Sequence, residues 1–197
     1  WIRLLYAYPE EIDDALIAAM KRSEKVCHYI DMPIQHADDF VLRRMGRRTS
    51  NADIRNKINA LREAMPDIAI RTSLIAGFPG ETEEMHQEML TFLKDMNLDR
   101  VGVFTYSKED GTPAATFENQ LSEETKEKWR DEIMTLQQGL EFRTNRSLVG
   151  KQFDVFVEGY MTEEDVYVGR TYRDAPGVDG LVFFSCEKEL ISGTIVP

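Results

Sequence analysis

The residues best placed to do chemistry follow an apolar, strand-like run. Residues 68–82, IAIRTSLIAGFPGET, pass from that run through a Gly-Phe-Pro-Gly turn into an acidic helical segment. In a parallel sheet, ligands bind where the C-terminal ends of strands meet such turns. Because Gly77 and Gly80 lack a Cβ, the backbone can turn sharply there and a ligand can approach main-chain atoms. The alternative interpretation is an ordinary tight connection between a strand and a helix.

This turn does not have the features of a phosphate-binding loop. Thr82 is expected to cap the following helix, and Glu81, Glu83 and Glu84 place negative charge at its positive end. A phosphate-binding loop would carry GxxxxGK at this place. We therefore expect a ligand other than a phosphate.

Charged and polar side chains also lie within the strand-like runs. In three of these runs one alternating phase is apolar and is expected to face helices, whereas the other phase carries Arg3, Asp31, Arg71 and Ser73. A charged side chain inside a strand needs a partner or a polar ligand. The sequence leaves two interpretations open, an internal ion pair between arginine and aspartate or a role in anchoring a ligand.

Two further groups of residues could contact a polar ligand. Gln35 and His36 come directly after a strand, where barrel enzymes place ligand contacts, although a single histidine is more often structural. The segment VLRRMGRR, residues 41–48, holds four arginines in six positions. These arginines either bind an anionic substrate or a cofactor carboxylate at the rim of a barrel, or they face water.

The sequence does not identify a catalytic nucleophile or a metal site. Its three histidines and two cysteines do not cluster at ligand spacing. Cys27 and Cys186 lie far apart in the chain, and both are expected to be buried, inert thiols. The catalytic residues are therefore unknown at this level.

Four units of strand and helix must position these residues. Strand patterns cover residues 1–8, 26–34, 68–76 and 100–106, and helical patterns cover residues 10–22, 38–45, 51–65, 83–96 and 122–147. This alternation predicts an α/β fold with a parallel sheet, either a barrel or a doubly wound sheet. Because no glycine-rich dinucleotide-binding motif follows any strand, we favour the barrel.

A second, smaller module begins near Leu148, so we expect domains at residues 1–147 and 148–197. Four short alternating runs, KQFDVFVEG, EDVYVGRTY, GLVFFS and ISGTIV, predict a small antiparallel β-barrel of OB-like size. Residues 151–197 hold 4 basic and 9 acidic side chains, a net charge of about −5. An OB-like module built for nucleic acid should instead show a basic groove with aromatic side chains.

Composition restricts the partners and the location. The net charge of −11 over 197 residues argues against non-specific binding of polyanions and suits a basic partner, or serves solubility alone. No run approaches the length of a membrane span and no leader is visible, so we expect no membrane association and a cytoplasmic location. The chain begins at Trp1 inside a strand-like run and ends at Pro197 just after another, and we expect it to be a fragment.

Five segments together resemble the methylthiotransferase family of radical S-adenosylmethionine enzymes: WIRLLYAYP, YIDMPIQHA, RTSLIAGFPGET, VGVFTYSKEDGTPAA and GRTYRDAPGVDG. The resemblance covers essentially the whole chain in collinear order. GFPGET and GTPAA are shared with the branch that modifies tRNA. LLYAYP, PIQHA and YRDAPGVDG resemble the branch that modifies an aspartate of a small-subunit ribosomal protein.

The resemblance implies a fold and a set of cofactors. The first domain would be the later strands of a partial, TIM-like radical-enzyme barrel, and the second would be a TRAM domain. S-adenosylmethionine would be cleaved by a four-iron four-sulfur cluster held by a CxxxCxxC motif, and a second such cluster would sit in an N-terminal domain. Neither motif occurs in this chain, so the resemblance implies that both lie upstream of Trp1 and that the isolated fragment is inactive.

The resemblance also implies half of a cofactor site. The backbone of Ile75 and Gly77 and the ring of Phe104 would lie near the adenine, with Gln35, Arg71 or Ser73 as polar contacts. The implied reaction is methylthiolation of the β-carbon of the aspartate, and an acidic TRAM domain suits a basic ribosomal protein better than RNA. The alternatives are a tRNA adenosine methylthiotransferase and a non-catalytic, acidic binding module for a ribosomal protein.

Overall fold

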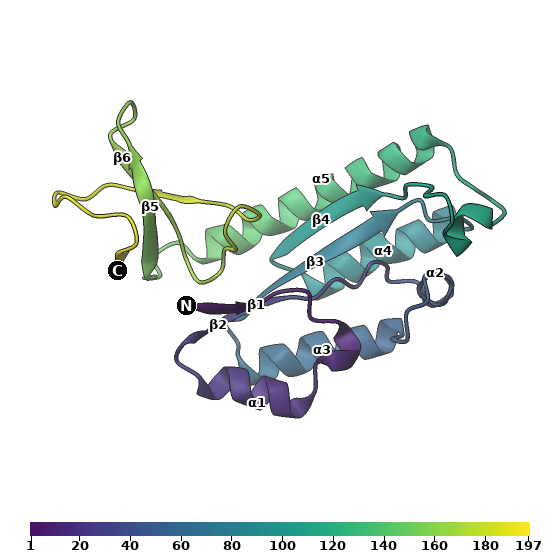
Figure 1. Ribbon diagram of the computed structural model, residues 1–197, viewed down its shortest axis with the longest axis horizontal. Helices are drawn as coiled ribbons and strands as arrows, with labels where there is room; N and C mark the ends of the chain where they lie inside the picture. Colours follow the sequence, from purple (N-terminus) through teal and green to yellow (C-terminus); the bar gives the residue numbers. More distant parts are fainter.

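Two sheets make up the protein, and a long helix connects them (Figure 1). The computed structural model describes all 197 residues. The first sheet is parallel, with the strand order β1-β2-β3-β4. Its strands are β1 (Ile2–Leu4), β2 (Val26–Asp31), β3 (Ala69–Ala76) and β4 (Arg100–Thr105). The predicted parallel α/β architecture is confirmed.

Five α-helices connect and cover these strands. They are α1 (Asp14–Arg22), α2 (Asp39–Arg44), α3 (Asn51–Ala64), α4 (Glu83–Met96) and α5 (Glu123–Ser147). Each begins after a residue whose side chain accepts a hydrogen bond from a backbone N–H in the first turn, which satisfies one of the free donors there. These capping residues are Asp13, Asp38, Ser50, Thr82 and Ser122. No helix combines the length and the apolar character that crossing a bilayer would require.

The two faces of the parallel sheet differ as the alternation predicts. Ile30, Ile70 and Leu74 are fully buried in the main core with side chains from the helices. The opposite phase forms what we call the open face, where Asp31, Arg71 and Arg100 lie side by side on neighbouring strands. Further along the strands, Ser73 pairs with Gly102 and Ile75 with Phe104 on this face. The charged phase of the strands is therefore turned away from the helices.

The first strand is shorter than predicted. It ends at Leu4 because Tyr6 takes a left-handed backbone conformation (φ 58°) and the N–H of Ala7 bonds to the carbonyl oxygen of Asp31. A 3-10 turn, η1 (Pro9–Glu11), follows. Helix α1 then starts at Asp14, four residues later than the apolar pattern predicts, because Asp13 caps it.

The second sheet is antiparallel, as predicted, with the order β7-β6-β5-β8. Its strands are β5 (Val155–Met161), β6 (Val166–Arg170), β7 (Val182–Phe184) and β8 (Ile195–Val196). The sheet curls into a half-barrel (Figure 1). Cys186 is exposed in this module, so the prediction that both cysteines are buried is wrong for Cys186 and right for Cys27. Cys186 follows the end of β7 at Phe184 and lies outside the strands of the sheet.

Candidate functional site

Three loops meet at the C-terminal ends of β2, β3 and β4. The N–H of Gln35 bonds to the carbonyl oxygen of Ser73 at 3.0 Å, and the N–H of Ile75 bonds to that of Gln35 at 2.9 Å. The loop after β4, which contains the 3-10 turn η2 (Pro113–Thr116), reaches the turn after β3, because the N–H of Gly80 bonds to the carbonyl oxygen of Asn119 at 3.0 Å. The segments PIQHA, GFPGET and GTPAA therefore share one edge of the sheet, which we call the rim.

A buried carboxylate closes the turn after β3. Oε2 of Glu81 accepts hydrogen bonds from the backbone N–H groups of Gly77 at 2.7 Å and Phe78 at 3.0 Å. Its Oε1 lies 3.1 Å from Nε2 of His36, and both side chains are buried. Nδ1 of His36 accepts a hydrogen bond from the N–H of Asp38, so Nε2 carries the ring proton that faces Glu81. His36 is thus buried against the turn, which supports its structural interpretation.

Sequence reasoning missed this role of Glu81. The sequence pattern places Glu81 as a negative charge at the start of the next helix, yet α4 begins only at Glu83. A turn with φ values of +77° at Gly77 and +87° at Gly80 leaves backbone N–H groups pointing inward. Buried N–H groups require an acceptor. A carboxylate directly after a Gly-x-x-Gly turn is a signal that could have identified the acceptor.

Gly77 is needed for packing as well as for the turn. A Cβ on Gly77 would lie 2.4 Å from Cγ of Lys126 and 3.3 Å from its Cα, so helix α5 occupies that space. Nζ of Lys126 is held by the carbonyl oxygen of Tyr106 at 3.0 Å and by Glu123 at 2.7 Å. On this side of Gly77 the space is taken by α5, and the predicted approach of a ligand to its main chain stays a prediction.

The open face next to the rim offers a shelf for a planar apolar group. Ile75 and Phe104 are cross-strand neighbours, and 60% of Phe104 is exposed. Gly102 adds no side chain between Phe104 and the charged residues farther down β4. Oγ of Ser73 lies 3.4 Å from a guanidinium nitrogen of Arg71, which puts polar groups beside the shelf. Apolar contact on a flat ring with polar groups at its margin suits a nucleoside such as the adenosine of S-adenosylmethionine.

Gln35 is held at the rim in a strained backbone conformation. Its φ is 71°, in the left-handed region that non-glycine residues rarely adopt. Such strain persists only where neighbouring hydrogen bonds impose it. Here the two backbone bonds to β3 do so and fix the residue against Ser73 and Ile75. Four of the six predicted cofactor contacts, Gln35, Ser73, Ile75 and Phe104, are thus brought together.

Arg71 lies in the middle of the open face and forms ion pairs. Its NH1 lies 2.8 Å from Oδ1 of Asp31, and its Nε lies 3.4 Å from Oδ1 of Asp179 in the second module. Burial acts to lower the pKa of the guanidinium, but the hydrogen bond to Asp31 and the charges of Asp31 and Asp179 outweigh burial and raise it. The ion-pair interpretation of Arg71 is confirmed, whereas its contact with a cofactor stays a prediction.

One segment of the second module, residues 171–179, covers the part of the open face away from the rim. We call it the clasp segment, and it makes hydrogen bonds to every strand of the parallel sheet or the loops before them. Its contacts are Arg3 with the carbonyl oxygen of Thr171 (2.7 Å), Tyr29 with Asp179 (2.6 Å), Arg100 with Asp174 (2.8 Å), Arg173 with the carbonyl oxygen of Asp67 (2.8 Å) and Arg173 with Asp99. The segment YRDAPGVDG therefore joins the two modules.

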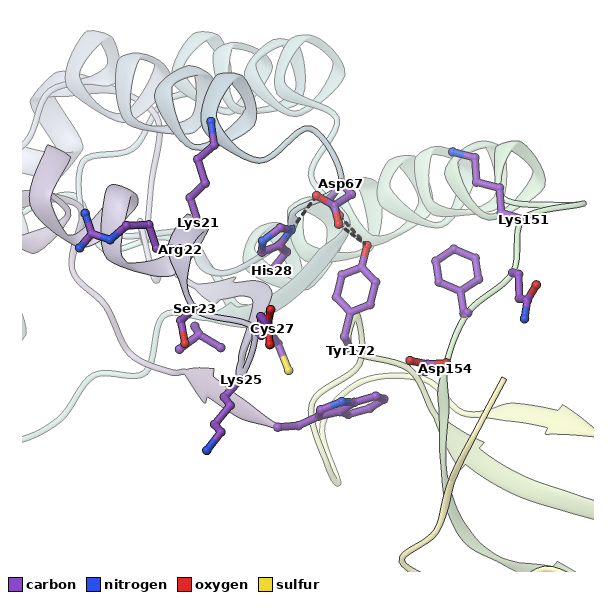
Figure 2. Close-up of a pocket in the computed structure, with 15 residues that line it drawn as sticks. Lys21, Arg22, Ser23, Lys25, Cys27, His28, Asp67, Lys151, Asp154 and Tyr172 are labelled. Carbon is purple, nitrogen blue, oxygen red and sulfur yellow. Dashed lines mark hydrogen bonds and ion pairs between the residues drawn. The ribbon is translucent and has the colours of Figure 1, made fainter.

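A cleft of about 600 Å³ lies between the two modules, at the end of the sheet opposite the rim (Figure 2). In it, Asp67 accepts hydrogen bonds from Tyr172 and contacts the ring of His28 at 2.7 Å. Lys21, Arg22 and Lys25 also line it. None of the predicted cofactor contacts does, so this cleft is separate from the candidate cofactor site.

Comparison with known proteins finds two domain matches and several similar sequences. Residues 3–93 match the family model of the radical SAM superfamily, and residues 149–197 match that of the TRAM domain. Over 196 residues the chain is 50% identical to the ribosomal protein uS12 methylthiotransferase RimO of Lachnoclostridium phytofermentans. It is 49% identical over 196 residues to the RimO of Clostridium botulinum strain Hall. The chain thus carries a radical SAM match followed by a TRAM match, and over its whole length it is similar to methylthiotransferases.

These family relatives are longer than the chain. Each match covers 100% of the chain but 44% of the relative, so the chain spans less than half the length of the curated methylthiotransferases that it matches. Among solved structures, coproporphyrinogen III oxidase (HemN) from Escherichia coli, a radical SAM enzyme, has a TM-score of 0.59 at 23% identity, covering 70% of this chain and 32% of that chain. At this identity the likeness concerns the fold alone.

Proposed function

We propose that this chain belongs to an enzyme that methylthiolates the β-carbon of an aspartate in a small-subunit ribosomal protein. The observation that carries the proposal is the 50% identity over the whole chain to a relative named for ribosomal protein uS12. We propose S-adenosylmethionine and two four-iron four-sulfur clusters as cofactors. The cluster ligands are assigned to residues outside this chain, whose two cysteines are 159 positions apart (27 and 186).

The rim is proposed as this chain's share of the S-adenosylmethionine site. The backbone of Ile75 and Gly77 and the ring of Phe104 contact the adenine, and Gln35, Arg71 and Ser73 supply polar contacts. The exposed ring of Phe104 beside Ile75 supports this assignment, as does the backbone of Gln35, which β3 holds in place. The bound cofactor and its cluster supply the radical chemistry, while the residues of the chain orient the nucleoside and shield it from water.

The TRAM module is proposed to attract the basic substrate protein. Its net charge of about −5 supports this role, because opposite charges speed encounter. The module lies at the end of the sheet opposite the rim (Figure 1). It therefore contacts a part of the substrate remote from the modified aspartate. We also propose that the domains divide at residues 1–147 and 148–197, and that the enzyme works in the cytoplasm, where ribosomal proteins are assembled.

A chimera tests this function. In the Lachnoclostridium relative, the 196 matching residues are replaced by this chain, and the protein is purified without oxygen and loaded with iron, sulfide and S-adenosylmethionine. It is then incubated with the small-subunit ribosomal protein and, separately, with tRNA. Mass spectrometry should show a methylthio group replacing a hydrogen on one aspartate. Modification of a tRNA adenosine instead would establish the tRNA activity, and no product with either substrate would favour a non-catalytic binding module.

A further inference from the structure

Four arginines form a surface without carboxylate partners. Arg43 and Arg44 end helix α2, and Arg47 and Arg48 follow it. No carboxylate oxygen lies within 4.0 Å of any of these four side chains. Arg71 and Arg100 on the open face, by contrast, each form an ion pair with an aspartate. We call these four residues the arginine surface.

Aromatic rings hold two of these guanidinium groups in place. The guanidinium carbon of Arg44 lies 4.3 Å from the centre of the Phe117 ring and 5.5 Å from that of Phe40. That of Arg47 lies 4.8 Å from the Tyr8 ring. Such contacts orient an arginine without cancelling its charge. Because Phe40 is 41% and Tyr8 is 48% exposed, part of each aromatic side chain is accessible beside the fixed charges.

The arginine surface borders the rim. A Cβ on Gly80 would lie 3.7 Å from the Arg44 guanidinium, and Phe117, on which Arg44 stacks, packs against Phe78 of the turn after β3. The acidic module lies at the other end of the parallel sheet from α2 (Figure 1). The four arginines therefore lie next to the candidate site, and the acidic TRAM module lies far from them.

We propose that the arginine surface binds the sugar-phosphate backbone of RNA, so that the enzyme takes its ribosomal protein in a complex with RNA. Arginine forks suit phosphate oxygens, and exposed aromatic rings stack on unpaired bases. An acidic protein segment would neutralise the arginines but would make no use of the exposed parts of the Tyr8 and Phe40 side chains. The net charge of −11 argues against polyanion binding by the chain as a whole, whereas binding at one surface depends on the charges nearby. The claim that the substrate protein is bound to RNA rests on the proposed function, whereas the claim that the arginine surface binds RNA does not.

The 197-residue chain and a labelled single-stranded RNA of about 20 nucleotides test the proposal by fluorescence anisotropy. The variant R43Q/R47Q/R48Q keeps Arg44, which packs on Phe117. The matched control K21Q/R22Q/K25Q removes three charges from the cleft of Figure 2. We expect the arginine variant to bind RNA about tenfold more weakly at roughly 50 mM salt and the control less than about twofold more weakly. Each phosphate contact of single-stranded RNA contributes about 0.7 to the salt slope, so the arginine variant should lose about 2.

Three results would overturn the proposal. They are no RNA binding by the unaltered chain, equal weakening in both variants, and competition by poly-glutamate as effective as competition by unlabelled RNA. The last result would assign the surface to an acidic protein. Circular dichroism melts of both variants should match the unaltered chain, since five of the six side chains are exposed and Arg47 is half-buried. If the chimera modifies its substrate while the chain binds no RNA, this inference fails and the proposed function stands. If the chain binds RNA through these arginines while the chimera modifies no substrate, the inference stands and the proposed function fails.

Discussion

The Arg71 guanidinium connects the two sheets of the protein, with NH1 2.8 Å from Asp31 and Nε 3.4 Å from Asp179. Asp179 also accepts hydrogen bonds from the Tyr29 hydroxyl at 2.6 Å and from the N–H of Ala175 at 2.8 Å. Arg71, for which the sequence pattern predicts either a ligand contact or an ion pair, thus anchors the TRAM module. The same side chain lies next to Ser73, so docking of the module and order at the candidate cofactor site are linked through one guanidinium.

Replacing Asp179 with asparagine should loosen this anchor. The variant D179N removes a charged acceptor from Tyr29 and Arg71, and we expect a loss of about 1–3 kcal/mol in the free energy of unfolding. The matched control is D154N, because Asp154 is exposed in the same module and makes no hydrogen bond; it should change stability by less than about 0.5 kcal/mol. Urea denaturation measures both, and equal effects would show that Asp179 does not anchor the module.

Tyr29 should make the stability of the protein fall in alkali. Burial and the hydrogen bond to Asp179 raise the pKa of Tyr29 above its ordinary value of 10.0. Above that ordinary value the unfolded chain loses the phenolic proton while the folded chain keeps it. Folding stability is therefore full below pH 10 and falls above it by up to about 1.4 kcal/mol per pH unit.

The variants Y29F and Y6F separate this effect from general alkaline denaturation. Tyr6 is 77% exposed and serves as the control. Between about pH 9 and pH 11, the unfolding free energy of Y29F should fall less steeply than that of Y6F or the unaltered chain. Identical slopes for all three proteins would contradict the role given to the Tyr29 hydroxyl.

Gly77 should tolerate no side chain. In G77A the new methyl group would meet Cγ of Lys126 at 2.4 Å, and a φ of +77° is strained for alanine. We expect a loss of about 2–4 kcal/mol. G150A isolates the backbone contribution, since Gly150 has a φ of +84° with nothing within 4 Å of a Cβ, and it should cost about 1 kcal/mol. Thermal melts measure both losses. Equal losses of stability in G77A and G150A would show that α5 shifts to make room for the methyl group.

Phe104 should contribute to cofactor affinity without supporting the fold. In the chimera, F104A should weaken binding of S-adenosylmethionine about tenfold, the effect of losing one ring that stacks on a base. The control is F183A in the TRAM module, because Phe183 is 59% exposed and Phe104 is 60% exposed. F183A should bind S-adenosylmethionine with unchanged affinity. Isothermal titration under anaerobic conditions measures both. Unchanged affinity in F104A would remove the adenine contact from the proposal.

Local signals in the sequence predicted most of the helices and strands. Helix α4 spans Glu83–Met96, as the apolar spacing predicts, because Thr82 caps it and Asn97 ends it in a left-handed conformation. The alternating phases of β3 correctly separated the buried side from the open face. These features depend on residues within a few positions of one another, which is the range that periodicity and capping describe.

Contacts between distant residues could not be predicted. The clasp segment binds side chains far away in the sequence, such as Arg3, which is 168 positions from Thr171. No periodic pattern encodes such pairing. In the turn after β3, Glu81 looks like part of an acidic helix start until the inward N–H groups of Gly77 and Phe78 are seen. In the same way, the shelf formed by Ile75 and Phe104 becomes visible only when the register between β3 and β4 is known.

Hydrogen–deuterium exchange of the loaded chimera, with and without S-adenosylmethionine, tests most directly whether the rim holds the cofactor. We predict slower exchange with the cofactor in the segments that contain Gln35, residues 73–77 and Phe104, and unchanged exchange in helix α1. Slower exchange confined to other parts of an active chimera, with these three segments unaffected, would contradict the assignment of the cofactor site to the C-terminal ends of β2, β3 and β4.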